Sequence, residues 1–447
     1  MKTNYIFSLA LGLLSLLLCP AMHAQQLTLE ACREAALQHN VKIQKQLLEV
    51  ENAELQRKEA FTKFFPSVSG LGGFVQFDKP QVEMDMSALV GAPVLLEMLK
   101  NGVVGAINAQ MPIFVGGQIV NGNRLAKVGY QIKQLQMLQT QNEVCLTAEQ
   151  YYWQVVSLQQ KLITLQAQQQ QLEAIVQDAQ NAVEAGLSNR NDLLQAQLYQ
   201  NKVASGIISL QGYLDVSKLV LAQYCGFWSP DDSLFDASSL LIDQQIMSDA
   251  AVQHPGELLV DHAAALPNTP EYALAQEGVR ATQLQYKMEV GSHLPTVAVG
   301  GSYSYTNLMR NNFGFGDNHK RTALAFATVS VPITDWWGGS YAMRRKKNAV
   351  RSAEYDRQEA SQLLIVRMQS AFTSLCTAHQ QIGIARKSIE QANENLRLEK
   401  DYYEAGTSTM SNLLKAQSSV QEAQDAFTDA WIDYQQKRLE YLQATGR

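Results

Sequence analysis

The sequence predicts a mainly helical protein that carries membrane β-strands and is built from two similar halves. Three observations support this fold class. The segment EAGLSNRNDLLQAQ at residues 184–197 returns as EAGTSTMSNLLKAQ at residues 404–417, with eight of fourteen positions identical. A proline-free helical stretch of about 65 residues precedes each copy. Two segments with the alternation of β-strands precede each long stretch, so the chain repeats one arrangement.

The first 24 residues have the features of a secretory signal peptide. Lys2 precedes an apolar stretch at residues 6–18, and Ala24 is a small residue at the expected cleavage position. Cys19 stands where a lipid-modified cysteine would, but the bulky Leu18 before it argues against lipidation. No later segment has the roughly 18 uninterrupted apolar residues of a membrane helix, so a membrane crossing would have to use strands.

The charge of the chain argues against nucleic-acid binding, and the spacing of its cysteines argues against a CxxC site. Without Lys2 the 36 basic residues become 35 against 42 acidic residues, a formal charge of −7 that gives no bias toward nucleic acid. After residue 24 the cysteines are widely spaced and form no CxxC motif: Cys32, Cys145, Cys225 and Cys376. Their apolar neighbours predict small buried hydrophobic side chains.

The first half of the predicted repeat covers residues 25–225. Its expected elements are a helix at 30–64, strands within 66–79 and 104–115, and helices at 120–184 and 188–224. The two shorter helices together have about 72 residues, close to the length of the long one, so end to end they would flank it. The loop between the strands contains the apolar stretch 86–99, which either folds inward as a lid or packs on its neighbours.

Residues 226–269 separate the halves and are rich in Pro, Asp and Ser. Within them, HPGELLVDH contains residue types that bind metals: His254, Glu257, Asp261 and His262. The histidines do not have the i, i+4 spacing of a helical metal site, and no other ligand cluster is near in sequence. We therefore predict a linker segment that binds no metal, in a chain that needs no cofactor.

The second half covers residues 270–447. Its expected elements are a helix, strands within 295–307 and 322–333, a long helix at 339–404 and a final helix. Trp336 and Trp337 precede the long helix, in a position that suits a membrane interface. The two halves thus predict equivalent helical arms, with tips near residues 184–192 and 404–412.

Both long helices carry an apolar seam with the 3.5-residue spacing of a coiled coil. The first seam consists of Leu158, Leu162, Leu165, Leu172, Val176, Ala179 and Val183, with Gln169 at the missed position. The second consists of Leu375, Ile382, Ile389, Leu396 and Tyr403. Each seam ends at a tip, which predicts two left-handed helical hairpins.

A glycine at each tip explains how the chain turns. Gly186 and Gly406 follow the ends of the seams, where a helix C-terminus favours a left-handed residue. The returning helices then need capping side chains, and the candidates are Ser188, Asn189, Ser408 and Ser411.

The strand segments predict a membrane sheet that requires more than one chain. Val297, Val299 and Tyr303 share one strand face, and Ile107 and Met111 share a face of another. The other two strand segments, within 66–79 and 322–333, alternate less clearly, so a soluble sandwich is the alternative for the strands alone. Four strands cannot close a barrel, which needs about eight, and open edges are not tolerated in lipid. We therefore expect an oligomer.

These residues together resemble the outer membrane efflux protein family, the TolC-type exit ducts of Gram-negative bacteria. The resemblance rests on the opening LTLEACREAALQHN at residues 27–40, the proline-marked strand pairs, the pairs Gly116–Gly117 and Gly338–Gly339, and the duplicated tips. It implies a homotrimer with a twelve-stranded outer-membrane β-barrel, four strands from each subunit, continuous with a coiled-coil tunnel through the periplasm. Residues 226–269 resemble the family's equatorial segment.

The resemblance also implies a function: the exit duct of a tripartite efflux or type I secretion system, docked on a periplasmic adaptor protein that an inner-membrane pump carries. The implied adaptor-docking tips are Glu184, Ala185, Gly186, Leu187, Ser188, Glu404, Ala405, Gly406, Thr407 and Ser408. The implied periplasmic aperture consists of Arg190, Asp192, Tyr403, Asn412 and Lys415. Tyr403 matches a tyrosine of the closed tip, and Asp192 matches its acidic partner.

The aperture departs from the family pattern at three positions. Asn412 and Lys415 stand where some members have aspartates, and Ser408 replaces an arginine of the gate. Three copies of Lys415 would make the mouth locally positive, with Arg190, Glu184 and Glu404 near enough to alter that balance.

Two other function classes are weaker. A trimeric coiled-coil surface fibre or adhesin would share the seams and the signal peptide, but it would not need two separated strand pairs. An exported enzyme would need a nucleophile, a base and a residue that orients the base, and the sequence offers no such grouping. We therefore predict a protein without enzymatic activity.

Overall fold

The computed structural model describes residues 27–79, 82–85, 87, 91, 95–98, 101–186, 188–227, 252–307, 319–333 and 336–447. Several predictions concern parts outside the described residues: the signal peptide at 1–24, Cys19, Leu187, most of the stretch 86–99, the linker residues 228–251 and the side chain of Trp336. The chain forms two compact units. We call Met1–Leu47, Gln136–Tyr272 and Ser361–Arg447 the helical unit, and Leu48–Leu135 and Ala273–Ala360 the sheet unit.

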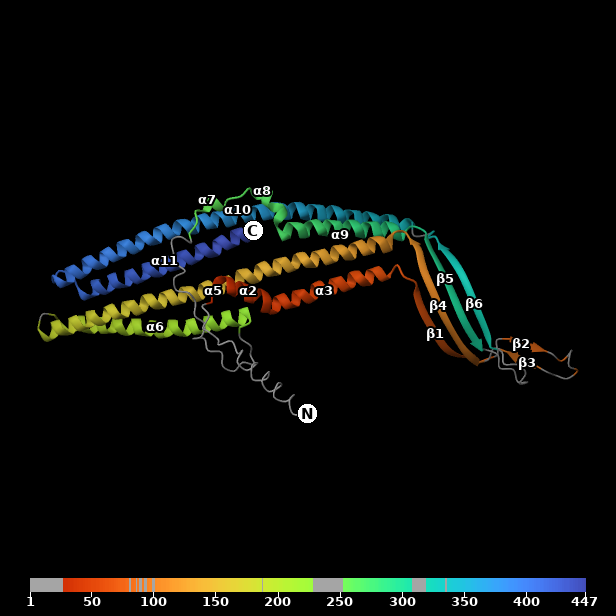
Figure 1. Ribbon diagram of the computed structural model, residues 1–447, viewed down its shortest axis with the longest axis horizontal. Coiled ribbons are helices and arrows are strands. Elements are labelled where there is room, and N and C mark those ends of the chain that lie inside the picture. The colour runs from red at the N-terminus through yellow and green to blue at the C-terminus, as the bar shows by residue number, and fades with distance from the viewer. Residues whose placement is uncertain are drawn as a thin grey trace, which may run out of the picture. The chain divides into compact units, whose positions relative to one another are not determined.

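The sheet unit contains the four strands that the sequence predicts. They are β1 (Ser67–Gln76), β4 (Asn101–Val115), β5 (Thr296–Asn307) and β6 (Lys320–Ser330). All neighbours are antiparallel, in the order β1-β4-β5-β6, and the four strands run side by side (Figure 1). A second hairpin, β2 (Val82–Asp85) with β3 (Leu95–Met98), lies in the segment we expected to be a loop. Four-residue strands are too short to show a clear alternation in sequence.

The register of the sheet aligns the expected faces. Ile107 lies opposite Tyr303, and both side chains are exposed. On the other face Asn108 lies opposite Ser302, whose Oγ donates to Asn108 Oδ1 at 2.7 Å. The exception is β6, where Phe326 falls on the polar face, opposite Gly300. A Cβ on Gly300 would lie 2.6 Å from Phe326 Cζ, so the glycine makes room for the ring.

A close approach of two glycines occurs elsewhere in the sheet unit. Gly116 follows β4 with a φ of 56°, and Gly291 lies near the end of α9 (Pro270–Ser292). A Cβ on Gly116 would collide with the Gly291 carbonyl oxygen, and a Cβ on Gly291 would collide with that of Gly116. Only the absence of both side chains allows the two backbones to meet here.

The long helices match their predicted lengths. They are α5 (Gln118–Glu184), α6 (Arg190–Cys225), α10 (Trp336–Glu404) and α11 (Met410–Ala444). In the helical unit α6 returns along α5 and α11 along α10, as two hairpins (Figure 1). Among the described residues no helix combines the length and apolar character needed to span a membrane.

The first predicted helix is wrong in one respect. Instead of one helix at 30–64, the chain forms α2 (Leu29–His39) and α3 (Val41–Thr62), separated at Asn40. Asn40 is extended, with a ψ of 130°. Its Oδ1 accepts from the Lys42 N–H at 2.9 Å, and its Nδ2 donates to the Tyr224 carbonyl at 3.0 Å. An asparagine that caps a new helix and also holds a distant carbonyl ends the first helix.

The predicted seams are the buried faces of the helical unit. Leu165 and Leu172 of α5 pack in one cluster with Ala196 and Val203 of α6 and with the first turns of α11. One seam position is corrected, because Gln168 is buried and Gln169 only half-buried. A helix with 3.6 residues per turn drifts from a strict 3.5-residue seam, so the residue on the neighbouring row becomes buried.

The linker supplies short elements to the helical unit: α7 (Pro255–Leu258), α8 (His262–Ala265) and the 3₁₀ turn η3 (Leu266–Asn268). Two of the four residues considered for metal binding, His254 and Asp261, cap these elements. His254 Nδ1 accepts from the Gly256 N–H at 3.1 Å, and Asp261 Oδ1 accepts from the Ala263 N–H at 3.0 Å. Among the described residues no group of three His, Cys, Asp or Glu could hold a metal ion.

Both halves of the repeat close in the same way. The glycine after α6, Gly226, has a φ of 75° and lies against His39 of α2. The glycine after α11, Gly446, has a φ of 73°, and its Cβ position lies 2.7 Å from the Asn268 carbonyl oxygen. Each half therefore ends with a left-handed glycine packed on the residue two positions before the helix that leads to the strands, α3 in the first half and α9 in the second.

Candidate functional site

The tip turns have the backbone that the repeated glycines predict. Gly186 has a φ of 74° and Gly406 a φ of 73°, both left-handed. The Ser188 N–H donates to the Ala182 carbonyl at 3.2 Å, and the Ser408 N–H donates to the Tyr402 carbonyl at 3.1 Å. These hydrogen bonds, each between residues six positions apart, satisfy carbonyls in the last turns of α5 and α10. The same helix end is therefore built at both tips.

The helices that return from the tips are capped by Asn189 and Thr409, and only the first of these was predicted. Asn189 caps α6 as predicted, accepting from the Asp192 N–H at 3.1 Å. Thr409 caps α11, accepting from the Asn412 N–H at 3.3 Å, so the predictions of Ser408 and Ser411 are both wrong. The cap must lie three residues before the N–H it accepts from, and Ser411 already lies inside the helix.

The two tip serines hold side chains in place. Ser188 Oγ donates to Asp192 Oδ2 at 2.9 Å within the first hairpin. Ser408 Oγ donates to Glu399 Oε2 at 2.7 Å and accepts from Asn412 Nδ2 at 3.2 Å within the second. Each serine is half-buried, and each fastens the tip loop to a neighbouring helix.

The remaining residues of the predicted docking tips form an exposed surface. The exposed members are Glu184, Ala185, Gly186, Glu404, Ala405, Gly406 and Thr407. Leu187 lies outside the described residues. The exposed tips consist of small side chains and backbone, with a carboxylate, Glu184 or Glu404, at the end of each long helix.

The predicted aperture residues are only partly brought together. Ser188 of the first tip donates to Asp192 of α6, and Tyr403 of α10 lies close to both side chains. Burial raises the pKa of Tyr403, and the nearby Asp192 and Asp178 carboxylates add to that effect while the nearby Ser188 hydroxyl opposes it. Tyr403, Ser188 and Asp192 therefore lie close together where the two hairpins meet.

The other aperture residues lie on the surface of the helical unit. Arg190, Asn412 and Lys415 are all exposed. Neither Arg190 nor Lys415 forms an ion pair within the part of the chain that the structure describes. Their charges are therefore available to solvent or to another chain.

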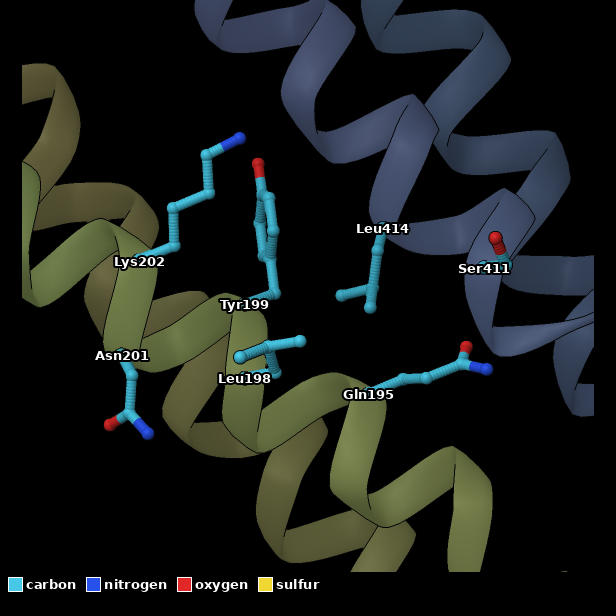
Figure 2. Close-up of a pocket in the computed structure, with 7 residues that line it drawn as sticks. All are labelled: Gln195, Leu198, Tyr199, Asn201, Lys202, Ser411 and Leu414. Carbon is cyan, nitrogen blue, oxygen red and sulfur yellow. The ribbon is translucent and has the colours of Figure 1, made fainter.

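A groove of 650 Å³ between α6 and α11 is a feature that the sequence analysis missed. It is lined by Gln195, Leu198, Tyr199, Asn201, Lys202, Ser411 and Leu414. Leu198 and Gln195 of α6 and Leu414 of α11 point toward the gap between the two helices (Figure 2). Leu198 is 71% exposed although it is apolar. A sequence signal existed, because Leu194 and Leu198 are spaced i, i+4 beside the buried row.

Buried glutamines make hydrogen bonds beside this groove. Gln168 Nε2 of α5 donates to the Tyr199 hydroxyl at 3.0 Å. The buried Gln417 of α11 donates through Nε2 to Gln171 Oε1 at 2.7 Å. The bond between Gln417 and Gln171 thus links α11 of one hairpin to α5 of the other.

Comparisons with known proteins agree with this architecture. The sequence matches the family described as outer membrane efflux protein over residues 32–226 and 263–447. It is 26% identical over 226 residues to the outer membrane protein OprJ of Pseudomonas aeruginosa. That alignment covers 47% of this chain and 46% of OprJ, so the chain spans about half the length of this curated relative.

Solved structures share the fold at low identity. The outer membrane protein VceC of Vibrio cholerae superposes with a TM-score of 0.73 at 15% identity, covering 94% of this chain and 96% of VceC. The CmeC outer membrane channel of Campylobacter jejuni superposes with a TM-score of 0.74 at 15% identity, covering 94% and 85%. The predicted fold, mainly helical with a small antiparallel sheet and an internal repeat, is confirmed.

Proposed function

Because the chain belongs to the outer membrane efflux protein family, we propose that it is the exit duct of a tripartite efflux or type I secretion system. The protein is located in the outer membrane and extends into the periplasm. In this proposal it passes small molecules or peptides from a periplasmic adaptor and an inner-membrane pump to the exterior, and it catalyses no reaction. Family membership does not favour the alternative of a surface fibre.

The four-stranded sheet is the observation that carries the proposal. Among the described strands, β1 and β6 each pair on one side only. One face of the sheet exposes apolar side chains, including Val68, Ile107 and Val329. An apolar face suits lipid, but lipid does not tolerate unpaired strand edges. Three copies joined edge to edge, β6 to the next β1, would give a closed barrel of about twelve strands.

The tips support the proposed contact with an adaptor. Their exposed backbone and the groove beside them lie on the hairpins of the helical unit. Leu198 exposes 71% of an apolar side chain at the groove, and burying it against a partner would contribute about 2 kcal/mol. A partner with an apolar side chain at the centre of its contact surface would fit this groove.

The oligomeric state is the first test of the duct. Native mass spectrometry of the detergent-extracted protein from outer membranes should give a mass near three chains. A stable monomer or dimer that persists across detergents would leave the sheet edges unpaired and would overturn the proposal.

The aperture gives a second test. We expect Lys415→Asp to increase cation preference in single-channel recordings, because three exposed ammonium groups become three carboxylates at the mouth. Asn412→Gln is a control that changes no charge. Unchanged selectivity for Lys415→Asp would exclude this residue from the aperture and leave the duct itself intact.

A further inference from the structure

We propose that Cys32 and Cys225 form a disulfide in the exported protein. Their sulfur atoms lie 3.1 Å apart, although the residues are 193 positions apart in sequence. Both side chains are fully buried. A disulfide requires a sulfur separation of about 2.05 Å, so the bond needs a side-chain adjustment of about 1 Å.

The backbone around the two cysteines is fixed by contacts on the same two elements. Cys32 lies on α2 and Cys225 is the last residue of α6. Asn40 Nδ2 holds the Tyr224 carbonyl at 3.0 Å, one residue before Cys225. Gly226, one residue after it, packs on His39. The sulfurs therefore meet because α2 is docked on the end of α6 at neighbouring points, and neither sits on a free terminus.

The pair differs from the other cysteines of the helical unit. Cys145 and Cys376 are half-buried, and neither sulfur contacts another sulfur within the part of the chain that the structure describes. The location also favours the bond, since an outer-membrane protein folds after export into an oxidising compartment. The inference rests on this location and is independent of the proposed duct.

The bond requires an oxidant, and a periplasmic thiol oxidoreductase that carries its own disulfide is the class that fits. A thiolate of one cysteine attacks that disulfide, giving a mixed disulfide and releasing one oxidoreductase thiolate. The second cysteine thiolate attacks the mixed disulfide, forms the bond between Cys32 and Cys225, and releases the other oxidoreductase thiolate. Two electrons pass to the oxidoreductase, and the two protons that leave the cysteines balance its two new thiols.

Burial sets the order of events. The hydrogen bond with Cys225 and burial raise the pKa of the Cys32 thiol well above its ordinary range. The thiolate is the reactive form, so the folded pair reacts slowly. The oxidation therefore belongs to the newly exported chain, before α2 docks on α6. Once formed, the bond joins the first described helix to the last helix of the first half and restricts the unfolded chain.

Thiol counting tests the proposal on the wild-type protein. The protein is purified from outer membranes, denatured without reductant, and alkylated with a maleimide, and its intact mass is compared with that of a sample reduced first. We expect two more alkyl groups in the reduced sample, and a proteolytic peptide pair linking Cys32 to Cys225. An equal number of alkyl groups in the two samples would overturn the proposal.

Variants separate this bond from any other. Cys32→Ser should leave one more thiol for alkylation without reductant than the wild type has, because Cys225 loses its partner. Cys145→Ser is the matched control and should leave one fewer. As a readout on stability, reductant should lower the thermal midpoint of the wild type and leave that of the Cys32→Ser, Cys225→Ser double variant unchanged. A wild-type midpoint that ignores reductant would contradict the proposed link.

Discussion

The first turns of α6 and α11 share a sequence pattern and differ in burial. Leu414 of α11 is 8% exposed, whereas its counterpart Leu194 of α6 is 52% exposed, and Leu413 is 3% exposed, whereas its counterpart Leu193 is half-buried. Met410 opens α11 with no exposed surface, and the equivalent position of α6 is the exposed Arg190. The duplication therefore keeps the turn and changes what the following helix touches.

Packing explains the difference between these two turns. Met410, Leu413 and Leu414 belong to the cluster that also contains Leu172 of α5, so α11 holds the two hairpins together. The first turn of α6 leaves part of its apolar surface uncovered beside the groove. The first turn of α11 thus stabilises the helical unit, whereas the first turn of α6 keeps apolar surface exposed to a second protein.

Replacing Met410 should give the largest contrast between the copies. Met410→Ala removes a fully buried side chain and should lower the free energy of unfolding by about 2–5 kcal/mol. Arg190→Ala at the matching exposed position should change it by less than about 0.5 kcal/mol. Denaturant unfolding in detergent measures both. Equal effects would mean that the two turns are buried alike in the assembled protein.

The groove should respond to a charge at Leu198. Leu198→Asp should reduce the amount of adaptor that co-purifies by at least about tenfold, since a carboxylate cannot be buried there without a partner, while stability changes little. Val216→Asp is the control, because Val216 is 60% exposed and lies on the same face of α6 five turns away. If both variants lose the adaptor equally, the contact is not specific to the groove.

The tip glycines should behave alike, in contrast to the helices that follow them. Gly186→Ala and Gly406→Ala should each cost about 1 kcal/mol, because both positions have a positive φ and open space around the added Cβ. Thermal unfolding of the two single variants and the double variant checks this. A cost at only one tip would show that the turns are not equivalent.

The smallest expected effect on stability concerns Asp425 of the second half, since the matching residue of the first half is Ser205. Burial raises the pKa of Asp425 above its ordinary value of 3.8, with Asp429 adding to the rise and Lys161 opposing it. Just above pH 3.8 the folded state therefore binds more protons than the unfolded state, so stability falls as the pH rises through this window. Asp425→Ser, which copies Ser205 of the first half, should raise the thermal midpoint at pH 7 and leave it unchanged at pH 3. A gain that is the same at both pH values would assign the effect to packing.

Local sequence signals predicted the tips and the strands. Gly186 and Gly406 need a left-handed backbone whatever surrounds them, and the alternation around Ile107 and Val299 is visible within each strand. The features that sequence reasoning missed depend on distant residues. The break at Asn40 requires the Tyr224 carbonyl, and the groove requires Leu414 to approach Leu198 from another helix. The cysteines were predicted as separate buried side chains, since nothing local brings Cys32 to Cys225.

The meeting of Gly116 and Gly291 has a consequence for how this gene can vary. Each residue excludes a side chain on the other, so a mutation at one codon finds no compensating mutation at its partner. In a saturation library both codons should tolerate no replacement, and revertants of either variant should restore glycine at the mutated codon. Two positions far apart in the gene must therefore both stay glycine, because their backbones are in contact and neither leaves room for a side chain.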